Sequence, residues 1–367
     1  MPIMIFPLSA GGPKVPQRVS LVTQTVGILK DNIKTGFWSG ELPGENELCA
    51  HLHVSRVTLR KALHELQREG WVRSSQGKRR KITPRPRRVV AASNRVILLT
   101  ASPLHLLHPF TIYWMDCLRG DLSEAGFHLE IHAGQTAFGS NPERSLAQMQ
   151  KQLHPAGWVL YRSNEPMQQW FSKHVLPCVI AGSRHAGVSL PSVDVDYHAT
   201  CRHAVGQFLA RKHKHLAFLN PDSGAAGDLK SEQGFLEAAK TGRGGEVQAT
   251  VIRHDGTVQG ICNKLDLLLK RPNPPTALLV SRPAFVLTAM SHLLRRKLDL
   301  PRDLALISRD DDSLLESMVP TVARYASSPT AFARKISRLV LQVASGAALS
   351  RDDILVMPSF VAGQTLG

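Results

Sequence analysis

Two arginines four positions apart carry the most specific chemistry in this sequence. Arg56 and Arg60 follow Ser55, whose hydroxyl can accept a hydrogen bond from the backbone N–H of Val57 or Thr58 and so begin a helix. A spacing of four places both guanidinium groups on one face of that helix. A guanidinium can pair with O6 and N7 of guanine in the major groove of DNA. The pattern therefore predicts a helix that reads base edges.

A run of basic residues follows a turn signal at Gln76 and Gly77. The run consists of Lys78, Arg79, Arg80 and Lys81. Residues 71–75 and 78–82 flank the turn, and we expect them to form a two-stranded ribbon. Its cations would neutralise phosphates and add affinity without sequence information. An isolated arginine is more often a solvated surface charge. The spacing, ribbon and charge together favour the DNA interface.

Three predicted helices position this surface. Apolar residues at helical spacing predict helices over residues 21–33 and 45–52, and a third from Ser55 to about residue 69. The third helix places Leu59, Ala62, Leu63 and Leu66 on one face. The basic residues lie largely off that face. Three helices and a basic ribbon predict a winged helix-turn-helix.

The positive charge of the chain is concentrated near its beginning. Residues 1–95 contain 17 Lys and Arg and 6 Asp and Glu, a net charge of +11, whereas the remaining 272 residues carry 28 and 23, a net charge of +5. A polyanion bound by the first quarter explains this distribution. We expect a DNA-binding domain at 1–83, a basic, proline-containing linker at 84–94 and a second domain at 95–367.

The second domain alternates strands and helices. Apolar runs near residues 96, 158, 178, 216, 277 and 304 alternate with helical stretches such as 197–212, 284–297 and 330–346. This alternation predicts an α/β fold of parallel sheets covered by helices, and its repetition fits two similar lobes. Ligands of such sheets bind beyond the carboxyl ends of the strands. The candidate effector-binding residues there are Phe110, Asp222, Arg282 and Asp310.

These side chains can stack on a ligand or pair with its hydroxyls and charges. Asp310 and Asp311 have a second interpretation, in which one carboxylate caps a loop and the other is solvated.

The segment from Leu42 to Lys78 closely resembles the GntR-family winged helix. The matching positions are Leu42-Pro43, Glu45, Glu47-Leu48, Val54-Ser55-Arg56, Thr58-Leu59-Arg60, Ala62-Leu63, Leu66, Glu69-Gly70 and Gln76-Gly77. The resemblance implies operator contacts by Arg56, Arg60, Gln76 and Gly77. The family often has an arginine where this chain has Asn46. The full DNA-contact prediction is Asn46, Ser55, Arg56, Thr58, Arg60, Gln76, Gly77 and Lys78.

From about residue 95 the chain resembles the LacI/GalR effector domain, which is similar to type I periplasmic sugar-binding proteins. The resemblance rests on residues 193–196, Gly234-Phe235, and residues 275–280, 301–304, 307–311, 320, 358–361 and 363–365. It implies two lobes, a sugar-like effector between them and a homodimer. Two ligand positions of the family are changed here: an arginine is replaced by Ser231, and a polar pair, commonly Asn-Asp, by Arg282-Pro283. These changes leave open an unusual sugar, an anion or no ligand. The pairing with a GntR-type winged helix resembles the AraR regulators.

Composition bears on other classes of protein. The sequence has no phosphate loop, zinc-protease or nucleophile-elbow motif, so we predict no enzyme, cofactor or metal. Five scattered cysteines argue against disulfides. No stretch of about 20 apolar residues and no recognisable secretion signal occurs, which favours a cytoplasmic protein over a membrane or periplasmic one.

The sequence thus predicts a DNA-binding transcription regulator, a repressor being the commoner expectation for such resemblances. A small molecule would control its affinity for double-stranded operator DNA. An open alternative is a DNA-binding protein whose cleft has degenerated and has no effector. A ligand-induced change in operator affinity separates the two.

Overall fold

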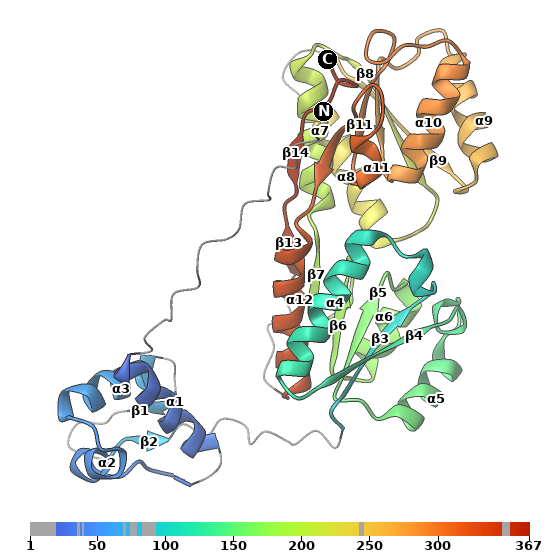
Figure 1. Ribbon diagram of the computed structural model, residues 1–367. Helices are drawn as coiled ribbons and strands as arrows, with labels where there is room; N and C mark the ends of the chain where they lie inside the picture. The colour runs from blue at the N-terminus through green and yellow to red at the C-terminus, as the bar shows by residue number, and fades with distance from the viewer. Residues whose placement is uncertain are drawn as a thin grey trace, which may run out of the picture. The chain divides into compact units, whose positions relative to one another are not determined.

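The computed structural model describes residues 20–34, 37–38, 40–68, 71–73, 79–82, 93–241, 246–346 and 353–367. The chain divides into two compact units, Met1–Arg87 and Arg88–Gly367 (Figure 1). The division falls within the linker predicted at 84–94, of which the structure describes only residues 93 and 94.

The first unit contains three helices and a short ribbon. These are α1 (Leu21–Lys34), α2 (Glu45–Leu52), α3 (Arg56–Arg68), β1 (Val72–Arg73) and β2 (Lys81–Ile82). β1 and β2 pair antiparallel, with Val72 opposite Ile82. The predicted apolar face of α3 is fully buried, together with Leu29 of α1 and Leu48 of α2. Burial of this face leaves the basic face of α3 outside.

The second unit has two lobes. The sheet of lobe 1 is entirely parallel, in the order β13-β7-β6-β5-β3-β4. Its strands are β3 (Arg95–Thr100), β4 (His128–Ala133), β5 (Gly157–Tyr161), β6 (Cys178–Ala181), β7 (Ser192–Val195) and β13 (Asp353–Val356). Helices α4 (Pro109–Glu124) and α12 (Pro329–Ala344) lie side by side on one face (Figure 1). The other face carries α5 (Glu143–Leu153) and α6 (Glu165–Lys173). Short 3-10 helices occupy Leu104–Leu106 and Thr136–Phe138.

Lobe 2 repeats this architecture, in the order β14-β12-β11-β10-β8-β9. Its strands are β8 (His215–Pro221), β9 (Gln248–His254), β10 (Ala277–Val280), β11 (Ala305–Ser308), β12 (Ala323–Ala326) and β14 (Ser359–Val361), the last being antiparallel to β12. Helices α7 (Tyr197–Ala210) and α8 (Ala226–Thr241) cover one face. The other face carries α9 (Val258–Leu269) and α10 (Pro283–Arg295). The short α11 (Ser313–Glu316) follows β11.

The six strands predicted from apolar runs all form, as β3, β5, β6, β8, β10 and β11. Each is apolar along its length because helices cover both faces of its sheet. The two-lobed α/β fold of parallel sheets confirms the predicted class.

The described chain passes between the lobes at three places: from β7 to α7, from β12 to α12 and from β13 to β14. Next to the first passage, α7 and α8 pack unusually closely at Gly234. A Cβ atom there would lie 2.2 Å from the carbonyl oxygen of His198, so only glycine allows this approach.

Candidate nucleic-acid interface and effector cleft

The start of α3 is built as the serine predicts. Ser55 Oγ accepts a hydrogen bond from the backbone N–H of Thr58 at 3.2 Å and lies 2.9 Å from the Thr58 hydroxyl. Arg56 and Arg60 are exposed, and the Val57 side chain between them is also exposed. The first turns of α3 therefore present two guanidinium groups and an apolar contact to solvent. This is the surface that a major groove can admit.

Glu45 connects the recognition helix to the ribbon. Arg60 Nε donates to one oxygen of the Glu45 carboxylate at 2.9 Å. Both terminal nitrogens of Arg80 donate to the other oxygen at 3.1 Å. The hydrogen bond from Arg60 is the largest influence holding the pKa of Glu45 below its usual value. The carboxylate thus orients two cations, the exposed Arg60 of α3 and the half-buried Arg80 directly before β2.

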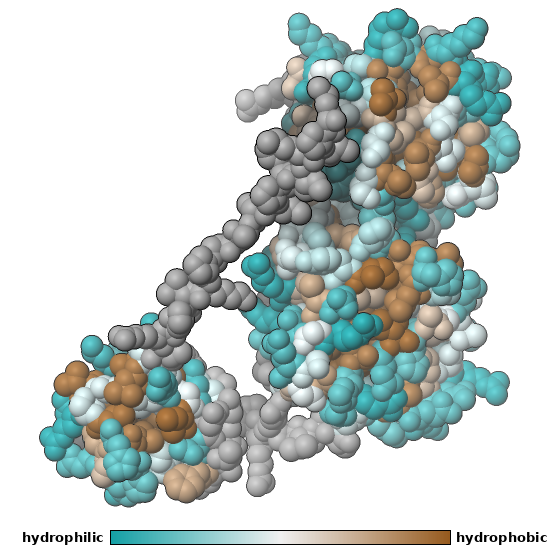
Figure 2. All heavy atoms as spheres, in the orientation of Figure 1, coloured by the Kyte–Doolittle hydropathy of each residue, from teal (hydrophilic) through white to brown (hydrophobic). Residues whose placement is uncertain are grey.

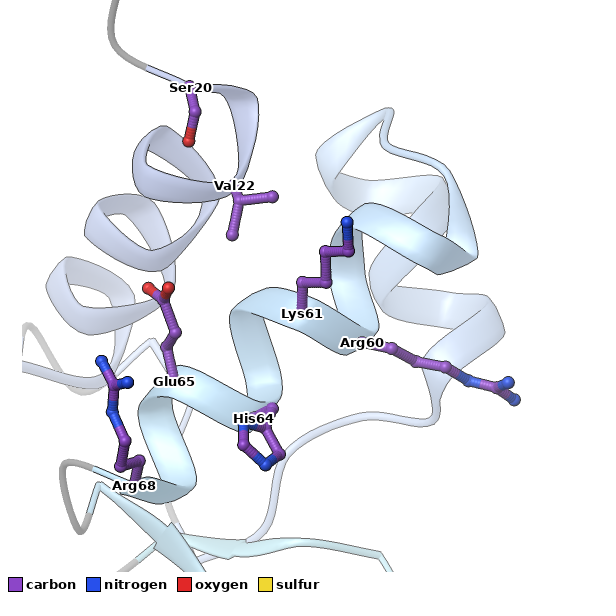
Figure 3. Close-up of a pocket in the computed structure, with 7 residues that line it drawn as sticks. All are labelled: Ser20, Val22, Arg60, Lys61, His64, Glu65 and Arg68. Carbon is purple, nitrogen blue, oxygen red and sulfur yellow. The ribbon is translucent and has the colours of Figure 1, made fainter.

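An open depression lies beside this surface (Figure 3). It is lined by Ser20 and Val22 at the start of α1 and by Arg60, Lys61, His64, Glu65 and Arg68 along α3. In Figure 3 the Arg60 side chain extends away from α1. The lining is mainly basic, which suits a phosphate backbone. Asn46 is exposed in the first turn of α2, next to Glu45. Gln76, Gly77 and Lys78 lie outside the described residues.

In lobe 2, Arg309 is the centre of a buried polar network. It follows β11, and its side chain is only 3% exposed. Its Nε and one terminal nitrogen donate to the two oxygens of Asp310 at 2.9 and 3.0 Å. Its other terminal nitrogen donates to Asp228 at 3.0 Å and to the Ser231 hydroxyl at 2.9 Å. The guanidinium also stacks on Tyr197, 4.3 Å from the ring centre. Burial opposes the charge of Arg309, but its carboxylate partners outweigh burial and hold its pKa above the usual range.

Arg282 joins the same network from the next strand. It caps the start of α10, and a terminal nitrogen donates to Asp228 at 3.1 Å. Ser223 donates to the same oxygen at 2.6 Å. Burial raises the pKa of Asp228, but Arg309, Ser223 and Arg282 reverse the effect and leave it below the usual value. Asp228 is therefore a buried carboxylate that accepts hydrogen bonds from two arginines.

Lobe 1 contributes a different buried acid. The Asp194 carboxylate lies at the end of β7, accepts from the hydroxyl of Ser183, and accepts from the backbone N–H of Val195 at 2.8 Å. Burial raises the pKa of Asp194 to about 6. The other lobe 1 group at this edge of the sheet is Arg162, which follows β5 with a left-handed backbone (φ 51°). Among the described residues, nothing forms a hydrogen bond or ion pair with its guanidinium.

The four residues predicted for the effector site are only partly brought together. Arg282 and Asp310 share the network around Arg309. Asp222 follows β8 with an exposed side chain. Phe110 lies in the first turn of α4 and packs against the core of lobe 1, with its ring centre 5.6 Å from that of Phe332.

Two polar contacts connect the lobes. His108 Nε2, at the start of α4, lies 2.6 Å from Asp312 Oδ2 in the loop after β11. Lys230 Nζ of α8 lies 3.9 Å from Asp353 Oδ2 of β13. Both pairs join segments that a movement of one lobe against the other would separate. The observed arrangement is thus held partly by charge.

Sequence reasoning did not name Arg309, Asp228, Asp194 or Arg162 as candidate effector-binding residues. Arg162 ends the predicted apolar run at 158–162, and Arg309 directly follows the run at 304–308, so the rule that selected Arg282 could also have found them. Asp228 lies one helical turn before Ser231 on α8. Its role depends on a contact with a residue 81 positions away, which no local pattern shows.

The described residues also bear on metal binding and on membrane insertion. They contain no group of three or more His, Cys, Asp or Glu placed to hold a metal ion. No described helix is both long and apolar enough to cross a membrane.

Comparison with known proteins divides the chain in the same way. Residues 21–82 match the family described as bacterial regulatory proteins, gntR family. Residues 205–366 match the periplasmic binding protein-like domain. YurK of Bacillus subtilis (strain 168), described as an uncharacterized HTH-type transcriptional regulator, is 47% identical over 60 residues, which are 16% of this chain and 25% of YurK. The HTH-type transcriptional repressor CytR of Escherichia coli (strain K12) is 22% identical over 286 residues, which are 75% of this chain and 82% of CytR.

The chain spans 25% of the length of YurK and 42% of the length of another relative, the regulator AglR of Rhizobium meliloti (strain 1021). Among solved structures, a complex of the transcriptional regulator CelR with cellobiose superimposes with a TM-score of 0.66 at 19% identity, over 85% of this chain and 91% of that one. This likeness supports the fold. The matches confirm both resemblances seen in the sequence. The chain therefore joins a segment that matches the GntR-family regulators, residues 21–82, to one that matches a periplasmic binding protein-like domain, residues 205–366.

Proposed function

We propose that this protein is a sequence-specific DNA-binding transcription regulator that acts as a repressor. A small molecule, such as a sugar or a related metabolite, would bind between the lobes and control operator affinity. In this proposal residues 1–83 bind double-stranded DNA, residues 84–94 connect the domains, and residues 95–367 sense the effector and dimerise. The protein would work in the cytoplasm, without a membrane partner and without catalysis.

The observation that carries the proposal is the exposed start of α3. Arg56 and Arg60 are presented from a capped helix, and a basic depression lies beside them. The same chain carries a domain whose relative CytR is named a transcriptional repressor and whose structural neighbour CelR was solved with cellobiose.

Selection of bound sequences from a random DNA pool tests the DNA-binding part. The full chain should enrich one sequence, and a competition gel shift should show at least about a thousandfold preference for it over random DNA, the lower end for specific regulators. Enrichment of no sequence would contradict the proposal.

Control by an effector is tested with Asp310→Ala. Only a ligand that binds the closed arrangement of the lobes better than the open one can shift their equilibrium, and operator affinity must then change reciprocally. Asp310→Ala should abolish the response while leaving operator binding without effector nearly intact. The measurement is fluorescence anisotropy of a labelled operator across a panel of monosaccharides, sugar acids and sugar phosphates. A variant that responds as the wild type does would show that Asp310 is not part of the switch.

We also propose that the active species is a homodimer formed through the effector domains. Large apolar side chains gather on the visible face of each lobe (Figure 2). In the effector domain, Leu106, Tyr113 and Val319 are large apolar side chains that are exposed. A single winged helix is a small DNA contact surface, so two copies would read a pseudo-palindrome. Light scattering should give twice the mass of the chain, and footprinting should show two half-sites. A monomer on one asymmetric half-site would refute this arrangement.

A further inference from the structure

The start of α10 has no side-chain acceptor at its N-cap. The Phe285 N–H already bonds to the Arg282 carbonyl at 2.9 Å, and Pro283 has no N–H. Arg282 occupies the N-cap and makes no capping hydrogen bond, and Pro283 follows it. Most helix starts use a Ser, Thr, Asp or Asn oxygen at this position to accept from the first free N–H groups. Here the N-cap residue is itself a cation. The positive end of a helix beside a guanidinium is a place that favours a negative charge.

Two buried side chains next to this helix start have a polar atom without a partner among the described residues. One of these atoms is the Oγ of Ser281, a fully buried residue that directly precedes Arg282 in the chain. His254 is 2% exposed, and its Nε2 is also without a partner. Its Nδ1 accepts from the backbone N–H of Gly256 at 3.0 Å, so a neutral ring carries its proton on Nε2. Both side chains can therefore donate to a ligand.

The His254 ring belongs to the same cluster as Arg282. Its centre lies 4.5 Å from that of Phe285 in the first turn of α10, and the Arg282 guanidinium lies 5.4 Å from the same ring. Burial, and then the charge of Arg282, lower the pKa of His254. Arg282, His254 and Ser281 thus surround the first turn of α10.

A second guanidinium comes from lobe 1. Arg162 and Arg282 follow the carboxyl ends of β5 and β10, the edges of the two sheets where ligands of this fold class bind. The Arg162 side chain is exposed, and nothing among the described residues forms a hydrogen bond or ion pair with it. Burial, and then the charge of Arg162, lower the pKa of Arg282, which agrees with this placement. An anion bound between two such cations would offset their repulsion.

The acids described above are bound by other groups. Asp228 is shared by Arg282 and Arg309, and both oxygens of Asp310 are bound by Arg309. Asp194 accepts from the Ser183 hydroxyl and from the Val195 N–H. Among the described residues, none of these three carboxylates forms an ion pair with Arg162.

We infer that the effector carries an anionic group, a carboxylate or a phosphate monoester, and that this group binds at the start of α10 between Arg282 and Arg162. The inference rests on the proposed function, because it names the chemical class of the effector that would control operator binding. The anion would accept from both guanidinium groups and from the Ser281 and His254 donors. It would also join the lobes, since its two cationic partners belong to different lobes.

The test uses the purified full chain without DNA. Thermal unfolding is followed at constant ionic strength while chloride is replaced by inorganic phosphate, and then with glucose, gluconate and glucose 6-phosphate as a matched neutral and anionic set. We expect phosphate and the anionic compounds to raise the unfolding midpoint more than chloride or glucose does. Arg162→Gln should weaken the affinity for the anion roughly tenfold, so that about ten times more anion is needed for the same rise of the unfolding midpoint. This is the usual effect of losing one charge-assisted hydrogen bond. The Arg162 side chain is exposed, so folding should be unaffected.

Arg282→Gln should weaken the response at least as much, and Arg302→Gln is the matched control. Arg302 lies in the same lobe, is 71% exposed and is already paired with Asp303, so its loss should leave the anion response unchanged. A response to inorganic phosphate alone would support a free anion, whereas a stronger response to the sugar derivatives would support an effector that carries one. Equal responses to glucose and its anions, no response to any anion, or an unaltered response in Arg162→Gln would each overturn the inference.

A failure of the proposed function would look different. Anion binding that leaves operator affinity unchanged would remove effector control but keep the anion site. Operator release by a neutral sugar, without any anion response, would do the reverse.

Discussion

Both domains contain a group of one carboxylate and two arginines, but one group is partly exposed and the other is buried. In the winged helix, the Glu45 carboxylate lies between Arg60 and Arg80, and in lobe 2 the Asp228 carboxylate lies between Arg282 and Arg309. The Glu45 and Arg60 side chains are 26% and 68% exposed, whereas those of Asp228 and Arg309 are 7% and 3% exposed. In the partly exposed group, the arginines can exchange the carboxylate for phosphates at little cost in free energy. The buried one cannot be opened without leaving charges out of water.

This difference shows how one chemical arrangement serves two purposes. On the surface it holds cations in a position that we propose faces DNA, and water screens and weakens the pairing. In the interior it fixes the residues that follow β10 and β11 against α8. Four predictions test this difference, each with a quantitative expectation.

The largest effect is expected for Asp228→Asn. The change keeps the shape of the side chain but leaves Arg309 and Arg282 without their shared carboxylate. Loss of one partner of a buried ion pair typically costs about 3 to 5 kcal/mol of unfolding free energy. Urea denaturation followed by tryptophan fluorescence measures it, because Trp114, Trp158 and Trp170 report on the effector domain. A loss below about 1 kcal/mol, the range of surface pairs, would mean that burial does not make the Asp228 group stronger than the Glu45 group.

The next prediction concerns Asp194, which is buried like Asp228 but has no arginine bound to it. Burial raises its pKa from 3.8 to about 6, so the native state holds this proton more tightly than the unfolded state. Its contribution to stability is complete below pH 4 and is lost as the pH rises through 6. The change amounts to about 3 kcal/mol at most, from 1.4 kcal/mol per pKa unit.

Asp194→Asn is the matched control for that pH dependence. The pKa values of His185 and His254 are lowered by burial, which gives stability that increases with pH in both proteins. The difference between wild type and variant isolates Asp194. If the two unfolding free energies run parallel between pH 4 and 7, the carboxyl group is not protonated in the folded protein.

The third prediction concerns base reading by α3. Arg56→Ala and Arg60→Ala should each cost about 1 to 3 kcal/mol at the cognate operator, because each removes a guanidinium that pairs with a base. Binding to random DNA should change far less. Competition gel shifts measure both affinities. Equal losses on operator and random DNA would mean that these arginines contact phosphates only.

The smallest effect on stability is expected for Glu45→Gln, less than about 1 kcal/mol, because the pair is partly exposed. Its effect on DNA binding should be clearer. Removal of a negative charge beside Arg60 and Arg80 should strengthen binding to random DNA and narrow the preference for operator. Titrations at two salt concentrations test this, with Glu47→Gln as the control, since Glu47 is exposed in the same helix. An unchanged preference would show that Glu45 does not orient Arg60 for recognition.

Sequence reasoning recovered the elements whose burial is regular. The apolar face of α3 and the strands covered on both faces are visible as simple periods. The edge strand β4 was not predicted, because every residue in it is partly or fully exposed and no apolar run marks it. β9 is another edge strand, next to β8 alone, and within it only Ile252 and His254 are buried. An apolar pattern in the sequence arises from burial, and an edge strand is buried too little to produce a clear one.

The cleft was harder to predict because its partners are distant along the chain. Arg282 and Asp310 were selected from their position after strands, but what they bind depends on Asp228 and Arg309. Residue 231, where relatives in the resembled family usually have an arginine, carries a serine whose hydroxyl accepts from Arg309. A guanidinium therefore reaches this position from another strand. A comparison made one position at a time shows only that an arginine is missing.

The close approach at Gly234 has a mechanical consequence. Its missing side chain lets the backbone of α8 rest against that of α7 at His198, where a methyl group would not fit. Two helices in backbone contact cannot slide past each other easily and move as one lever. One arm of this lever carries Asp228 at the cleft, and the other begins at Tyr197, where the chain enters from lobe 1. A displacement of Asp228 would therefore be transmitted to Tyr197, next to the passage between the lobes.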